Sequence, residues 1–374
     1  MKAAVWTCLI HLAFLTAGMS ASEAGQQKIF ISGTTSNELY VIDPATNTLV
    51  QTIKVNRPHG LAATKDGKFL WVASDWFDPH HRATITRIDT ATGQILETHG
   101  VPHNDAMALV NDDRDLYIAG FPMGCFYVFD TVDRKLVASF DVRGMAHNVV
   151  APAHDDRLIY LAPMGRDEKE VSAYGKYLGG YTNCAGQPEM PRNSHQIYVV
   201  DTSSRKLVDT IETGTAPRPI AVSDDGSWLY ANVDDLLGFE IIDLKARRVV
   251  QRAEPTVPDS ETGAIKLEQG NIVSRSHGIW LTPDQREVWT DSTNDGVVYA
   301  FDRSSGTVRF LARIPVGEVP YWLTFSPDGK YGYSSNRGDD TVSVIDVATH
   351  KEIKRIALPK ESGPHTSLGV ALSP

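Results

Sequence analysis

Histidines recur at a fixed interval along this chain of 374 residues. Three of them, His59, His103 and His147, are spaced by 44 residues, and two more, His277 and His365, are separated by twice that number. Tyr321 lies midway between the last two, and Arg218 takes the corresponding place between the third and the fourth. Neutral imidazole is a ligand for iron, copper, zinc and other transition metals, and imidazole with guanidinium also suits a small polar or anionic molecule. The spacing therefore predicts a metal site or a small-ligand site wherever the fold gathers these side chains.

Within such a site the residue types predict different roles. The five histidines would hold iron, copper, zinc or manganese, with an open position for a substrate. Tyr321 or His277 would transfer protons if a reaction takes place. Arg218, Trp76 and Trp322 are the candidates for contacts with a bound organic ligand. The alternative is that these histidines simply line a partly hydrated pore.

The periodicity depends on how the sequence is aligned. When the second predicted strand of each repeat is aligned instead, the residues that match His59 are Asp105 and Asn148. His103 and His147 then lie one or two positions earlier. The five imidazoles are therefore not all expected to point in the same direction.

A repeat accounts for the spacing of the histidines. Its clearest copy, SPDGKYGYSSNRGDDTVSVIDVATHKEIKRIALP, runs from Ser326 to Pro359 and combines short alternating strands with polar turns. Weaker copies, such as DDGSWLYAN followed by GFEIIDLKARRVV, extend along the chain. A period of about 40 to 45 residues with β-type alternation is typical of propeller blades. A single blade cannot bury its two apolar faces, so neighbouring blades must cover them.

Seven innermost strands are predicted, each just before a turn, in the segments HGLAATKD, DAMALVND, NVVAPAHD, RPIAVSDD, HGIWLTPD, YWLTFSPD and LGVALSP. The last has no outer strands after it, whereas the N-terminal copy from Lys28 to Val55 has outer strands and no inner one. We expect an all-β, seven-bladed propeller over residues 25–374, closed by pairing the C-terminal inner strand with the N-terminal outer strands.

The unit from Pro327 to Ile353 resembles the repeat of the YVTN family of β-propeller proteins, with YSSN where that family usually has YVTN. The resemblance covers nearly the whole chain after its first 24 residues. It implies an exported seven-bladed propeller, but it implies no particular activity, because members of the family have diverse roles.

Three segments exceed the repeat: 74–83, 163–194 and 254–276. The first two join a second strand to a third, and the last joins an outer strand to the next inner strand. In an up-and-down blade both kinds of connection emerge on the face where the inner strands begin. The insertions and the histidines are therefore expected on one face, which is the candidate surface for a small molecule or a protein partner.

Residues 1–24 have the features of a secretory signal: Lys2, an apolar stretch from Ala3 to Leu15, and small residues before Ala24. They predict export to a periplasmic or extracellular compartment, and no later segment is apolar enough to span a membrane. In such a compartment Cys125 and Cys184 either form a disulfide or remain two free thiols. The net charge of -10 and the pI of about 5.6 disfavour binding to nucleic acid.

Three functions remain open from the sequence. The first is a histidine-lined central site for a metal ion or a small polar ligand. The second is a metal-free scaffold for protein interactions, and the third is a metal-dependent lyase or oxygenase, for which the only support is analogy with enzymes of the same architecture. Motifs of serine hydrolases, zinc proteases, haem attachment and phosphate loops are absent from the sequence.

Overall fold

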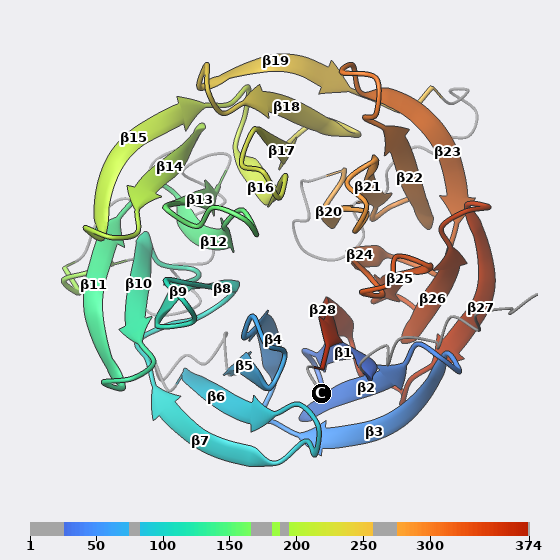
Figure 1. Cartoon of the computed structure of the whole chain (residues 1–374), viewed down its shortest axis with the longest axis horizontal. Helices are drawn as coiled ribbons and strands as arrows, with labels where there is room; N and C mark the ends of the chain where they lie inside the picture. The colour runs from blue at the N-terminus through green and yellow to red at the C-terminus, as the bar shows by residue number, and fades with distance from the viewer. Residues whose placement is uncertain (1–25, 75–82, 166–181, 188–193, 257–274, 373–374) are drawn as a thin grey trace, which may run out of the picture.

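A computed structural model describes residues 26–74, 83–165, 182–187, 194–256 and 275–372 of the chain. Within these ranges the strands form seven four-stranded antiparallel sheets, which are arranged as blades around a central axis (Figure 1). The all-β, seven-bladed propeller predicted from the repeat is confirmed. The leader predicted over residues 1–24 lies outside the described residues.

Each blade runs from an innermost strand beside the axis to an outermost strand at the rim (Figure 1). The first three blades comprise β4 (Pro58–Ala63), β5 (Phe69–Ser74), β6 (Thr84–Asp89) and β7 (Ile95–Gly100); β8 (Met107–Val110), β9 (Asp115–Ala119), β10 (Cys125–Asp130) and β11 (Lys135–Asp141); and β12 (Met145–Val150), β13 (Leu158–Met164), β14 (Gln196–Asp201) and β15 (Lys206–Glu212). The next three comprise β16 (Pro217–Val222), β17 (Trp228–Val233), β18 (Phe239–Asp243) and β19 (Arg248–Ala253); β20 (Ile279–Leu281), β21 (Glu287–Ser292), β22 (Val297–Asp302) and β23 (Arg309–Pro315); and β24 (Pro320–Phe325), β25 (Tyr331–Asn336), β26 (Thr341–Asp346) and β27 (Lys351–Ala357). The seventh comprises β28 (Pro364–Ala371), β1 (Gln27–Gly33), β2 (Glu38–Asp43) and β3 (Thr48–Lys54).

One turn chemistry recurs in all seven blades, between the third and the fourth strand. The third strand ends at an aspartate whose carboxylate accepts a hydrogen bond from a backbone N–H two or three residues later; these residues are Asp43, Asp89, Asp130, Asp201, Asp243, Asp302 and Asp346. The residue four positions after each aspartate has a positive φ, between 51° and 79°. The aspartate thus closes the turn locally, which explains why the ID or FD pair recurs in the sequence.

Apolar clusters between neighbouring blades form the core. In one of them, Trp71 and Ile85 from one blade pack with Leu116 and Phe129 from the next. Trp71 and Trp289 are almost fully buried between sheets. Each blade therefore depends on its neighbours for burial, and the central positions of the inner strands are held in a fixed ring.

The ring closes where the two ends of the chain meet. Strand β28 pairs with β1 in antiparallel register from Gln27 opposite Ala371 to Gly33 opposite Pro364. Beyond this ladder, the backbone N–H of Thr34 donates to the carbonyl of Gly363. The predicted closure is confirmed, and it leaves no unpaired inner strand at the seam.

Strand direction sorts the connections onto two faces. Inner strands begin on the face that also carries the connections between second and third strands and those between an outer strand and the next inner strand. We call this the insertion face, because the insertions at 74–83, 163–194 and 254–276 belong to it; residues 75–82, 166–181, 188–193 and 257–274 of them lie outside the described residues. No helix in the described ranges is long and apolar enough to cross a membrane.

Candidate functional site

The inner strands present one polar or aromatic side chain per blade at their insertion-face ends. Around the ring these residues are His59, Asp105, His147, Arg218, His277, Tyr321 and His365. Tyr321 is half-buried and the others are buried, with exposed fractions of 2% to 8%. We call this set the imidazole ring.

Four of the predicted histidines are in contact with one another. The ring centroids of His147 and His277 are 5.5 Å apart, those of His277 and His365 5.8 Å, and those of His365 and His59 4.2 Å. His147 and His277 come from blades that are separated by a whole blade, and so do His277 and His365. The side chains therefore converge toward the axis and do not merely follow the rim.

The fifth histidine has a different place. His103 is buried two residues before Asp105, and it is Asp105 that lies beside His59, with Asp105 Oδ1 2.7 Å from His59 Nδ1. Gly60 permits this approach, because a Cβ at that position would lie 1.9 Å from the Asp105 carbonyl oxygen. The alignment thus gives the right residue in the second blade, Asp105, but the wrong one in the third. There His147, at the 44-residue spacing, lies in the imidazole ring, whereas Asn148 Oδ1 accepts a hydrogen bond from the backbone N–H of Ile220.

Burial keeps three of the imidazoles neutral, those of His147, His277 and His365. It lowers the pKa of His147 to about 4, and it lowers the pKa values of His277 and His365 well below the ordinary value of 6.5. Arg218 lowers the pKa values of His147 and His277 further and Arg337 that of His365, whereas the Asp105 carboxylate raises the pKa of His147 in part. At neutral pH these rings therefore act as donors and acceptors of hydrogen bonds, or as metal ligands, and not as cations.

The hydrogen-bond partners assign lone pairs to particular nitrogens. Nδ1 of His277 lies 3.0 Å from the carbonyl oxygen of Tyr321, which can only accept, so the ring proton belongs on Nδ1 and the lone pair on Nε2. The Asp105 carboxylate lies 2.7 Å from Nδ1 of His59 and favours a proton there by its charge, although the contact does not have hydrogen-bond geometry. Nδ1 of His147 is buried without a hydrogen-bond partner in the described part of the chain.

A buried carboxyl group holds the backbone at His277 in place. Asp291 accepts hydrogen bonds from the backbone N–H groups of His277 and Gly278, each at 2.9 Å. Burial raises the pKa of Asp291 well above its usual value. Its backbone contacts fix the chain at the start of β20, and they leave the His277 ring free to face the axis.

Two arginines face the imidazole ring in different ways. Nε of Arg218 donates to Oδ1 of Asp234 at 2.6 Å, so this charge is largely neutralised inside the protein. The guanidinium of Arg337 lies 5.4 Å from the centroid of the Tyr321 ring and has no hydrogen-bond or ion-pair partner among the described side chains. Sequence reasoning missed Arg337; the signal was its place in the second-to-third-strand turn of the clearest repeat.

The aromatic candidates differ in their contacts with the imidazoles. Tyr321 stacks on His277 with a centroid distance of 3.8 Å. Trp322 is 8% exposed, and its ring centroid lies 5.9 Å from that of His365 and 6.0 Å from that of His277. It therefore packs beside the two imidazoles. Trp76 was predicted, with Arg218 and Trp322, to contact a bound organic ligand. It lies outside the described residues.

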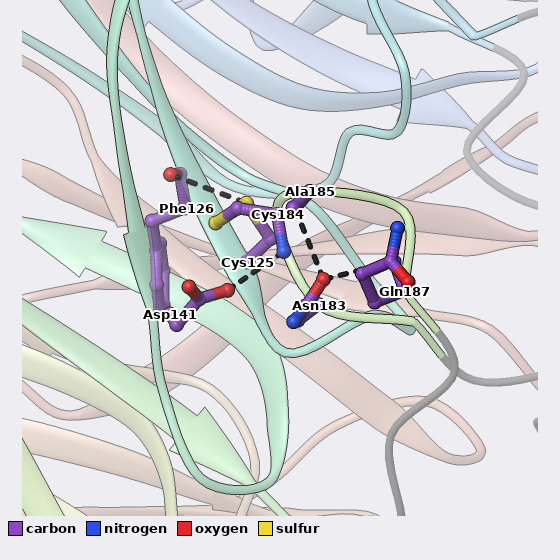
Figure 2. The surroundings of a disulfide bond; sticks show 7 residues. All are labelled: Cys125, Phe126, Asp141, Asn183, Cys184, Ala185 and Gln187. Atoms are coloured by element: carbon purple, nitrogen blue, oxygen red, sulfur yellow. Dashed lines mark hydrogen bonds between the residues drawn. A yellow bond between two sulfur atoms is a disulfide. The ribbon is translucent and has the colours of Figure 1, made fainter.

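A disulfide anchors the described part of the longest insertion (Figure 2). Cys125, the first residue of β10, is bonded to Cys184. The backbone N–H of Cys184 donates to Asp141 Oδ1, and Asn183 Oδ1 accepts from the N–H groups of Ala185 and Gln187 (Figure 2). Of the two alternatives that the sequence left open, the structure has the disulfide, and it ties this insertion to the neighbouring blade.

Whether the protein can hold a metal ion depends on how the possible ligands are arranged and not on the number of histidines. In residues 26–74, 83–165, 182–187, 194–256 and 275–372, no group of three or more His, Cys, Asp or Glu side chains is arranged to hold a metal ion. The imidazoles are gathered, but their donor atoms do not form a ready coordination shell.

Comparisons with known proteins relate the chain to other propellers. It is 25% identical over 227 residues to the antigen Lp49 of Leptospira interrogans, covering 57% of this chain and 44% of the relative. It is 27% identical over 165 residues to the hydrazine synthase subunit beta of Kuenenia stuttgartiensis, covering 40% and 42%. The chain thus spans less than half the length of these curated relatives.

Among solved structures, the periplasmic gluconolactonase of Pseudomonas aeruginosa matches with a TM-score of 0.68, at 18% identity, over 92% of this chain and 99% of that one. This likeness establishes the fold. No protein-family model matches the chain, so membership in the YVTN family stays a prediction.

Proposed function

We propose that this protein binds a small, oxygen-rich organic anion or lactone at the imidazole ring and hydrolyses the lactone. The observation that carries the proposal is the convergence of four contacting imidazoles, one of them beside Asp105, near the guanidinium of Arg337, which has no ion-pair partner among the described residues. Such a set combines an anion anchor with a base in a largely buried place.

Arg337 is the proposed anchor. Its charge has no internal partner in the described chain, whereas Arg218 already pairs with Asp234. A guanidinium offers two parallel N–H groups to a carboxylate or to the oxygens of a lactone. The neutral imidazoles of His277 and His365 then supply hydrogen bonds to hydroxyl groups without adding charge.

His59 is the proposed general base. With its proton held on Nδ1 by Asp105, Nε2 accepts a proton from water as the water oxygen attacks the lactone carbonyl. The ring C–O bond then breaks, and the same proton returns from the imidazolium to the departing alkoxide. The product is a hydroxy acid, which releases its carboxyl proton to water, and the resulting carboxylate pairs with Arg337. The gluconolactonase with the same fold supports the substrate class only as an analogy.

The test is hydrolysis of glucono-lactone and simpler lactones, followed by pH-stat titration, together with calorimetric binding of the hydroxy acid products. Asp105→Asn should lower kcat by roughly 10²- to 10⁴-fold with little change in KM, because it removes the group that orients the base. Arg337→Met should raise KM and the Kd of the hydroxy acid by about tenfold or more, because it removes a charge-assisted contact.

Arg303→Met is the matched control. Arg303 makes the same kind of contact, 5.6 Å from the ring of Tyr230, but it lies away from the imidazole ring. This variant should leave kcat and KM unchanged. Failure of the wild-type protein to bind any lactone or hydroxy acid would sink the proposal and bring the interaction scaffold forward.

A transition-metal site is the second candidate. It is favoured by the lone pair on His277 Nε2 and by the unpartnered Nδ1 of His147, both buried near the axis. Elemental analysis of protein purified without a histidine tag decides between the two. Near-stoichiometric iron, copper, zinc or manganese that is lost in His147→Gln would support the metal; a metal-free protein that takes up none of these ions would remove it.

Export is part of the same proposal. The disulfide between Cys125 and Cys184 favours an oxidising compartment, as the leader-like residues 1–24 do. Protein recovered from the periplasm or the medium should begin near Gly25 on N-terminal sequencing. An intact N-terminus there would contradict cleavage of the leader.

A further inference from the structure

A second hollow lies on the opposite face, where the inner strands end. It is a cavity of about 300 Å³ lined by residues from six of the seven inner strands and from the turns that follow some of them. Its lining positions come two to four residues after the imidazole ring along each strand; they include Leu61, Met107, Val149, Trp280 and Leu368. At about 3.3 Å per residue, the two places are on the order of 10 Å apart along the strands. The cavity is therefore separate from the imidazole ring.

The lining is mainly apolar, with a single aromatic residue, the half-buried Trp280. Trp280 follows His277 by three residues, which places it at the opposite end of the inner strand from the imidazole ring. The cavity lies at the lower limit of volumes that hold small organic ligands.

One carboxylate breaks the apolar lining. Asp224 lies in the turn after β16, and its side chain has no hydrogen-bond or ion-pair partner in the described part of the chain. Burial raises the pKa of Asp224 from its usual value. The next residue, Asp225, accepts a hydrogen bond from the Ser223 hydroxyl of the same turn, as Asp66 and Asp328 do from Thr64 and Ser326 in theirs. Asp224 takes the turn position that Lys65 and Pro327 occupy in other blades.

Neighbouring groups fix the place of Asp224. None in the described chain forms a hydrogen bond with its carboxylate, although the charges of His154 and Arg303 offset part of the rise in its pKa. Its backbone N–H donates to Gln285 Oε1 at 3.2 Å, and Nη1 of Arg303 donates to the Gln285 carbonyl at 2.6 Å. The guanidinium of Arg303 is thereby held over the ring of Tyr230 and not on the carboxylate. A half-buried carboxylate without a partner costs stability unless a ligand neutralises it.

We propose that this cavity is a second binding site, and that its ligand is a small organic amine with a short hydrocarbon body. The ammonium group would pair with Asp224 and lie against Trp280, and the hydrocarbon part would fill the apolar lining. The charge of Asp224 would repel a carboxylate of the same length. This site would therefore prefer a cation, whereas the imidazole ring is proposed to bind an anion.

The test is isothermal titration calorimetry of the full chain with hexylammonium, hexan-1-ol and hexanoate at neutral pH. Hexylammonium should bind most tightly, the alcohol about tenfold more weakly, and the acid weakest, because only the first makes a charge-assisted contact. Asp224→Asn should reduce the affinity for hexylammonium to about that for hexan-1-ol. Asp112→Asn is the matched control, since Asp112 lies in an equivalent turn and its side chain is 99% exposed.

Ala151→Phe, in the cavity wall, should abolish binding of both hexylammonium and hexan-1-ol. Circular dichroism establishes whether this variant is folded; if it is not, the comparison of Asp224→Asn with Asp112→Asn decides alone. Equal affinity for hexylammonium and hexanoate, no binding of hexylammonium, or unchanged hexylammonium binding in Asp224→Asn would each overturn the proposal.

Discussion

The two ends of the central channel are built from the same seven strands, yet their chemistry is opposite. At the insertion face the strands begin with polar side chains that pair with one another, such as His59 with Asp105 and Arg218 with Asp234. At the other face the same strands end in apolar residues around the carboxylate of Asp224, which has no side-chain hydrogen bond in the described chain. The difference arises within two to four residues of each inner strand.

This contrast shows how a propeller separates function from stability. The contacts between blades bury the apolar core and fix the strands. The residues at the strand ends are therefore not needed to form the core. The buried charge of Arg218 at one end is paired with Asp234, whereas the half-exposed carboxylate of Asp224 at the other end has no hydrogen bond in the described chain. The predictions below test whether the two ends differ in this way.

The largest effect should follow from breaking the buried pair at the insertion face. Asp234→Ala leaves the Arg218 charge buried, and we expect it to lower the free energy of unfolding by about 3 to 5 kcal/mol in urea titrations. Asp209→Ala, which removes the half-exposed partner of Arg247, should cost at most about 1 kcal/mol. Equal losses in the two variants would show that burial of the pair has no special role.

A smaller effect should appear as a dependence of stability on pH. The pKa of His147 is about 4 in the folded state against 6.5 unfolded, so the unfolded state binds the extra proton between these values. Stability should therefore fall as pH drops from 6.5 to about 4, with a contribution of roughly 3 kcal/mol from His147, and should be independent of this group above pH 6.5.

The pH effect can be isolated with His147→Gln. Asp291 acts in the opposite direction, because its raised pKa makes the folded state bind more protons above pH 3.8. Since Asp291 is present in both proteins, the difference in urea-derived stability between wild type and variant reports on His147. Parallel stability curves for the two proteins from pH 4 to 7 would contradict a lowered pKa of His147.

The smallest effect is expected at the other end of the channel. Asp224→Asn removes a half-buried charge that has no partner in the described chain, so the free energy of unfolding should stay within about 0.5 kcal/mol or rise slightly. Thermal unfolding followed by circular dichroism measures it. A loss above about 1 kcal/mol would reveal a stabilising contact of Asp224 and would remove the contrast between the two ends.

The repeat was enough to predict the fold. The seven inner strands, the closure of β28 on β1 and the face that carries the insertions all follow from local patterns, because each blade uses the same turn chemistry and the same alternation. The convergence of His59, His147 and His365 could also be anticipated, because equivalent positions of a closed ring must face the same axis.

The partners within the site could not be read from the chain. Asp105 rather than His103 lies beside His59, because the register of β8 and the glycine at position 60 decide which residue approaches. Arg337 comes from a turn between outer strands, and Trp280 faces the opposite end. By itself the sequence determined the blades, their number and the axis on which the histidines meet, since these depend on periodicity. Which side chains pair, which stay neutral and which remain unmatched was decided only by tertiary packing, because burial and distance across the axis arise from blades far apart in the sequence.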